Sequence, residues 1–82
     1  MNLNVYPNPV HDRITVEFNA TASGNYSLNI MDMTGRLLST AANTSIEGLN
    51  TQVIDVSNLA KGMYMLELRA SDSSEKLRIV VE

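Results

Sequence analysis

The sequence predicts an all-β fold, a small immunoglobulin-like antiparallel β-sandwich of about seven strands. Apolar and polar residues alternate along several segments, which is typical of strands with one buried face. Turn-forming residues separate these segments roughly every 8 to 12 residues. No segment is both long enough and regular enough at a period of about 3.6 residues to form a helix of any size. Because one sheet alone would leave its apolar face in water, we expect two facing sheets.

The alternation places the strands along the chain. It is clearest in four segments, residues 13–18, 25–30, 63–70 and 76–81. Shorter strands are expected at residues 3–6, 37–40 and 52–56. We expect Leu77 to point into the core, whereas Met63, Met65 and Glu67 should lie on an outer face. Exposed methionines suggest contact with a neighbouring domain or a receptor, although a partly covered sheet face explains them equally well.

The segments between the strands are rich in residues that favour turns. These segments are residues 7–9, 22–25, 32–35, 45–50, 58–62 and 71–74. The prolines of the first segment exclude it from a central strand. Asp32 and Gly35 predict a type I turn with a following bulge. We expect Leu59 to close one end of the sandwich and Tyr64 to be buried with its hydroxyl on a partner.

The length of the chain fits a single domain over residues 1–82. With 44% hydrophobic and 18% charged residues, its composition is that of a folded globular protein. The N-terminus has neither the basic start nor the apolar stretch of a signal peptide, and no apolar run approaches the roughly 18 to 20 residues of a membrane span. We therefore expect a domain excised from a larger secreted precursor, with its export signal elsewhere and no insertion into a membrane.

Several classes of function lose support. The absence of cysteine excludes a disulfide framework and a thiolate site. A net charge of −3 with scattered basic residues argues against binding to nucleic acid. The only histidine, His11, has Asp12 beside it, but neighbours on a strand face opposite sides. Since the acidic residues form no short calcium-binding loop either, we expect no catalytic residue, no metal and no other cofactor.

Three short motifs occur in order along the chain. Tyr6-Pro7-Asn8-Pro9-Val10 precedes one alternating segment, Asp32-Met33-Thr34-Gly35-Arg36 follows another, and Leu59-Ala60-Lys61-Gly62-Met63-Tyr64 introduces a third. Their order and spacing resemble the successive signatures of type A C-terminal sorting domains of the type IX secretion system, also named the Por secretion system. Each motif alone occurs in many loops, whereas three in register over about residues 5–81 are specific.

The resemblance implies a signal domain at the C-terminal end of a cargo protein from the Bacteroidetes group. In that family the cargo reaches the periplasm, the domain targets it through an outer-membrane translocon, and a cell-surface sortase commonly removes the domain. The residues that match the family's motifs are Pro7, Asn8, Pro9, Gly35, Gly62, Tyr64 and Lys76. The chain departs from many members at its end, where Val80-Val81-Glu82 stands in place of a terminal lysine.

Two hypotheses of function compete. The first is a recognition module, in which an exposed face of the sandwich, including the last strand, is bound by translocon and sortase components while the domain is joined to its own N-terminal cargo. The second is an immunoglobulin-like structural or adhesive module that binds carbohydrate or a neighbouring domain. A sugar site usually needs exposed aromatic side chains, and the chain offers three tyrosines and no tryptophan.

Overall fold

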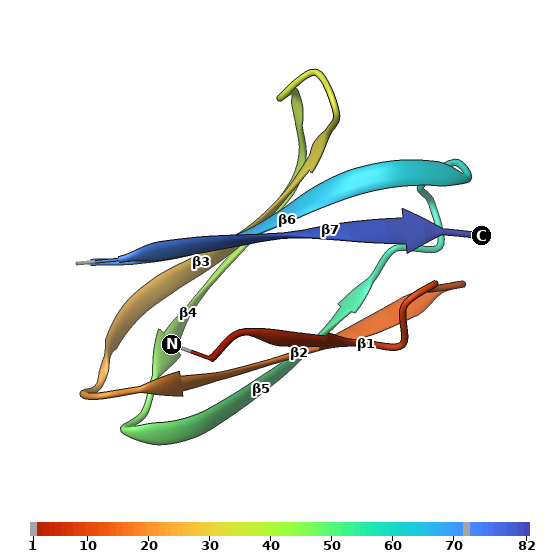
Figure 1. Cartoon of the computed structure of the whole chain (residues 1–82). Helices are drawn as coiled ribbons and strands as arrows, with labels where there is room; N and C mark the ends of the chain where they lie inside the picture. Colours follow the sequence, from red (N-terminus) through yellow and green to blue (C-terminus); the bar gives the residue numbers. More distant parts are fainter. Residues whose placement is uncertain (1, 72) are drawn as a thin grey trace.

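The computed structural model of the chain describes residues 2–71 and 73–82. Its strands are β1 (Asn4–Tyr6), β2 (Arg13–Ala20), β3 (Gly24–Asp32), β4 (Leu37–Ser45), β5 (Gly48–Asp55), β6 (Gly62–Ala70) and β7 (Ser74–Val81). They form two antiparallel sheets, one in the order β1-β2-β5 and the other in the order β4-β3-β6-β7 (Figure 1). The predicted all-β sandwich is confirmed, and the described residues contain no helix that could cross a membrane.

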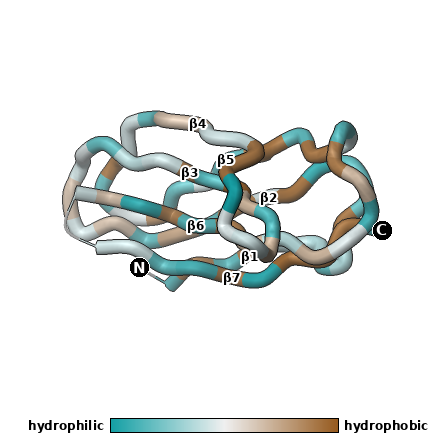
Figure 2. The backbone as a smooth tube through the Cα atoms, turned by 90° about the horizontal axis from the view of Figure 1, so that it is seen from above, coloured by the Kyte–Doolittle hydropathy of each residue, from teal (hydrophilic) through white to brown (hydrophobic). Residues whose placement is uncertain are grey.

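The core lies between the two sheets. Inward side chains recur at every second residue, as in β2, where Ile14, Val16 and Phe18 are buried. Figure 2 shows the resulting alternation of hydrophobic and hydrophilic stretches along the strands. The rings of Phe18 and Tyr26 meet edge to face across the core, with centroids 4.8 Å apart. The other buried apolar side chains are Val10, Leu28, Ile30, Ile54, Val56, Tyr64, Leu66, Leu68, Ile79 and Val81.

Two side chains keep the predicted face but not the burial expected of it. Leu77, predicted to point into the core, is 37% exposed, because β7 is the last strand of its sheet and only β6 lies beside it. Glu67, predicted to be outward, is only 7% exposed. It lies in the middle of the outer face, where Asn29 Nδ2 donates to its Oε1 at 3.2 Å and Arg69 Nη2 lies 3.4 Å from its Oε2.

The connection between β4 and β5, which passes from one sheet to the other, is tighter than the sequence predicts. β4 continues to Ser45 and β5 begins at Gly48, so that the expected turn over residues 45–50 shrinks to two residues. The buried side chain of Asn50 accepts a hydrogen bond from the amide of Ile46 at 2.9 Å and donates to the carbonyls of Ile46 and Gly48 at 2.9 and 3.0 Å. One side chain thereby satisfies backbone groups that a longer loop would leave to water.

Replacing a core leucine tests the sandwich. Leu28→Ala removes a fully buried side chain from β3, and we expect it to lower the free energy of unfolding by about 2–5 kcal/mol. The matched control is Leu37→Ala on β4, where the side chain is 54% exposed and the change should stay within about 0.5 kcal/mol. Urea titration of the two variants measures both values. Equal losses would contradict the described core.

Candidate functional site

The strand register brings the three motifs to one end of the four-stranded sheet. Asp32 of β3 pairs with Tyr64 of β6, which pairs with Ile79 of β7. Two residues nearer the end of the sheet, Gly62 pairs with Val81. In Figure 1 the loops that precede β2 and β6 lie beside the C-terminus. This region is termed the signature end, and it consists of residues 7–10, 32–36, 60–64 and 78–82.

The first motif binds the free edge of β7. The amide of Val10 donates to the carbonyl of Val80, and the amide of Glu82 donates to the carbonyl of Val10, both at 2.8 Å. These two bonds form a parallel bridge between residue 10 and residue 81. Asn8 extends it, because its Oδ1 accepts from the amide of Val80 at 3.2 Å and its Nδ2 lies 3.4 Å from the carbonyl of Arg78. Loop 7–10 therefore acts as a short additional strand on β7.

The prolines of the first motif explain why the side chain of Asn8 makes these bonds. Pro7 and Pro9 have no amide hydrogen to donate, and each follows a cis peptide bond. Asn8 lies between them with a side-chain amide that can both donate and accept. It therefore pairs with one N–H and one C=O of the strand edge, as a backbone amide would.

The second motif forms a turn closed by Asp32. Its Oδ1 accepts from the amide of Thr34 at 2.9 Å, from the Thr34 hydroxyl at 2.5 Å and from the amide of Arg36 at 3.0 Å. Gly35, at φ +92°, donates its amide to the carbonyl of Asp32 at 3.0 Å. The predicted turn with a glycine bulge is confirmed. The bond from the Thr34 hydroxyl, with the Arg36 amide and guanidinium, holds the pKa of Asp32 below its ordinary value.

The third motif leads the chain into β6. Gly62 has a φ of +155°, which residues with a Cβ atom rarely adopt. Tyr64 is buried, and its hydroxyl donates to the carbonyl of Ala60 at 2.5 Å, as expected of a buried tyrosine with a partner. Leu59 packs against the core and closes this end of the sandwich, which confirms the prediction for it.

Lys76 is the one motif residue that the structure does not bring to the signature end. It lies exposed on β7, opposite Glu67 and midway along the sheet. The outer face of this sheet also carries Arg69, which pairs with Ser74, and Arg78, which pairs with Met65. In a chain of net charge −3, this face is locally basic, because among the described residues these three cations face one carboxylate, Glu67, which pairs with Arg69.

Sequence reasoning missed the partner of the first motif, which is the backbone of residues 78–82. The available signal was the asparagine between two prolines, because the prolines have no amide hydrogen and Asn8 has the only side chain in residues 7–9 that can donate and accept. Two more bonds join the N-terminal region to the same strand. Leu3 donates its amide to Glu75 Oε2 at 3.2 Å, and His11 Nδ1 lies 3.3 Å from the carbonyl of Glu82.

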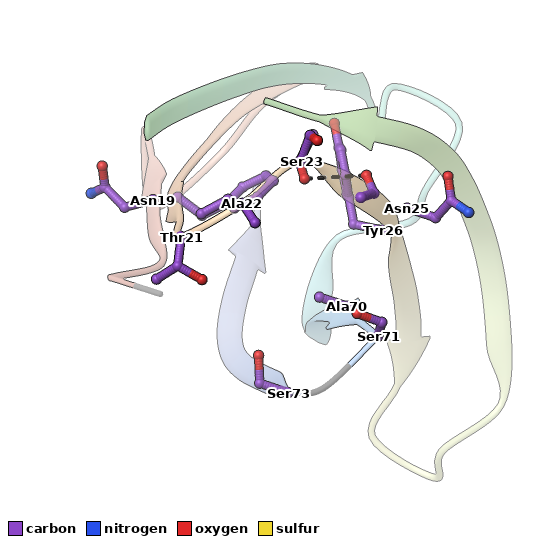
Figure 3. Close-up of a pocket in the computed structure, with 13 residues that line it drawn as sticks. Asn19, Thr21, Ala22, Ser23, Asn25, Tyr26, Ala70, Ser71 and Ser73 are labelled. Carbon is purple, nitrogen blue, oxygen red and sulfur yellow. Dashed lines mark hydrogen bonds between the residues drawn. The ribbon is translucent and has the colours of Figure 1, made fainter. Parts of the chain in front are cut away.

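A shallow hollow of about 300 Å³ lies at the opposite end of the sandwich (Figure 3). Small and hydroxyl-bearing side chains of the loops after β2 and β6 line it, with Phe18 and Tyr26 at its inner side. Among the described residues, no group of three or more His, Asp or Glu side chains is placed to hold a metal ion. The side chains that line the hollow in the described part of the chain are apolar, amide or hydroxyl groups.

The aromatic side chains bear on the carbohydrate hypothesis. Tyr26 and Tyr64 are buried, so neither offers a ring face to a sugar. Tyr6 is 42% exposed, and its hydroxyl donates to Glu17 Oε2 at 2.7 Å, which raises the pKa of Tyr6 above its ordinary value. One exposed ring that is already tied to a carboxylate gives little stacking surface.

Comparison with known proteins identifies the family. The sequence model described as "Secretion system C-terminal sorting domain" matches residues 4–82, which is essentially the whole fold. The chain belongs to this family of type IX secretion signals, and the resemblance that the three motifs indicate is confirmed. Membership makes it part of a secreted or cell-surface protein that interacts with the type IX machinery. No curated protein matches the chain.

Removing the Asn8 side chain tests its bonds to β7. Asn8→Ala takes away one acceptor and one donor at the strand edge, and we expect a loss of about 1 kcal/mol in stability. Amide hydrogen exchange should accelerate most at Val80, whose N–H the side chain accepts. Asn19→Ala, at an exposed position of β2, is the matched control and should leave that amide unchanged. Unaltered exchange at Val80 in Asn8→Ala would contradict the described contact.

The lowered pKa of Asp32 predicts a loss of stability in acid. A carboxyl whose folded pKa lies below its ordinary value of 3.8 stabilises the fold fully above that value and ceases to do so as pH falls through the folded pKa. Asp32→Asn keeps the shape of the side chain and removes its charge. We expect the melting temperature of the unaltered chain to exceed that of this variant at neutral pH. The difference should shrink as the pH falls below 3.8. A pH-independent difference would refute the assignment.

Proposed function

We propose that residues 1–82 are the C-terminal sorting domain of a larger precursor, and that this domain carries its cargo from the periplasm through the type IX outer-membrane translocon. A cell-surface sortase then cleaves the domain from the cargo. The family match supports the signal function. The observation that carries the proposal is the meeting of all three motifs at one end of the four-stranded sheet. The first and third motifs pair with the C-terminal half of β7, and Asp32 of the second pairs with the neighbouring strand β6.

This geometry fits a signal that is bound in its folded form. A partner that docks on a strand edge or sheet face needs that surface fixed before binding, because ordering it on contact would cost affinity. The bridge between Val10 and Val81 and the bonds of Asn8 hold the last strand in place. The basic outer face formed by Arg69, Lys76 and Arg78 lies next to it, and complementary charge on a partner would steer association there.

A reporter fusion tests the proposal. The domain is joined to the C-terminus of a fluorescent protein that carries its own signal peptide, and the fusion is expressed in a bacterium with a type IX system. We expect the reporter in the medium or on the cell surface, and in the periplasm of a strain that lacks the translocon. Mass spectrometry of the exported reporter should find the domain removed. A reporter that stays periplasmic in both strains would refute the signal function.

Variants of the fusion distinguish the two surfaces that support the proposal. Asn8→Ala weakens the hold on β7, and the pair Lys76→Glu and Arg78→Glu reverses the charge of the outer face. We expect Asn8→Ala and the charge-reversed pair each to lower the amount of exported reporter several-fold, because each removes one or two polar contacts. Asn19→Glu, at an exposed position of the other sheet opposite Leu49, is the control and should be exported normally. Thermal unfolding of each isolated domain verifies that a loss of export does not reflect a loss of fold.

A further inference from the structure

One edge of the four-stranded sheet carries none of the features that usually block pairing between strands. β4 (Leu37–Ser45) has nine residues and a single hydrogen-bonded neighbour, β3. Alternate residues of an edge strand direct their N–H and C=O groups away from the sheet. Edges are normally protected by charged residues, proline, bulges or short length. The only irregularity of β4 is a register shift opposite residues 30 and 31, and residues 39–45 contain neither charge nor proline.

The other edges of the two sheets are protected or short. β7 carries Lys76 and Arg78, and the first motif covers its C-terminal half. β1 has three residues. β5 is open, but Glu47 precedes it and Asp55 ends it, so an antiparallel pair of two β5 strands would bring acids together. Like charges directly opposite each other destabilise a strand pair.

The charges that flank β4 have the opposite arrangement. Arg36 precedes the strand and Glu47 follows it by two residues. If two copies of β4 pair antiparallel with Ala42 of each on the twofold axis, Ser45 of one copy lies opposite Ser39 of the second. The segment that leaves β4, with Glu47, then comes near the segment that enters the second copy's β4, with Arg36. The same contact recurs at the other end, because the twofold axis repeats it. The side chains of residues 39–45, between these ends, are small and uncharged, so the strands can approach closely.

We propose that β4 is a self-association surface, on which a second copy of this chain adds its own β4 to form a continuous eight-stranded sheet. The pairing rests on main-chain hydrogen bonds along residues 39–45 and on two ion pairs between Arg36 and Glu47 of different copies. The Arg36 side chain contacts Asp32 but is still 77% exposed, so it can reach the second copy. An interface of one strand pair is small, and we expect a dissociation constant on the order of 0.1 mM.

Sedimentation of the chain over a range of concentrations tests this inference. We expect a monomer at low micromolar concentration and a dimer near millimolar concentration, with slower amide exchange in β4 as the dimer forms. Ala42→Lys places two cations on the twofold axis, at an exposed position of the outer face, and should raise the dissociation constant at least tenfold. Asn19→Lys adds the same charge to the central strand β2 and should leave the dimer unchanged.

Charge reversal gives a second test that does not alter the strand. Glu47→Arg places like charges at both ends of the pair and should weaken the dimer several-fold, whereas the double variant R36E/E47R should restore it to within about twofold. A chain that remains monomeric at about 1 mM, roughly ten times the expected constant, or a dimer that Ala42→Lys does not weaken, would overturn the proposal. Binding of an extended segment of another protein along β4 of a monomeric chain would also overturn it.

Discussion

The bonding of the first motif to the edge of β7 is the interaction on which the signature end depends. The final strand of a sheet has unpaired backbone groups on one side, and the last residues of a chain are held only where such groups find partners. Val10 and Asn8 provide partners for residues 78–82. The N-terminal and C-terminal regions of the domain are thereby joined, so the end of the chain becomes part of the sandwich.

The sheet register converts three motifs that are distant in sequence into one surface. Each motif satisfies a different backbone requirement: an edge to be paired, a tight turn at Gly35 and a bend at Gly62. All three lie where β3, β6 and β7 end or begin. Under the proposed function, this end offers the translocon a surface that does not depend on the cargo joined to the domain. Lys76 lies apart from it and contributes to the basic outer face.

Much of the fold followed from the sequence, because alternation of apolar residues directly reflects burial of one sheet face. The segments with strong alternation, such as residues 13–18, are strands in the structure. The second half of β4 was missed because an edge strand need not bury large side chains, and residues 41–45 have none. The exposure of Leu77 and the burial of Glu67 were not predicted, for a related reason. Alternation with a period of two assigns a side chain to a face but does not say how far neighbouring strands cover it.

The motif residues were recognisable in sequence, but their meeting was not, since it depends on the pairing of strands far apart in the chain. The claim that residue 10 pairs with β7 can be measured directly by solution NMR, through scalar couplings transmitted across hydrogen bonds. The structure predicts couplings from the amide nitrogen of Val10 to the carbonyl carbon of Val80 and from that of Glu82 to the carbonyl carbon of Val10. The absence of both couplings, together with exchange of these amides at the rates of an unstructured chain, would contradict the account.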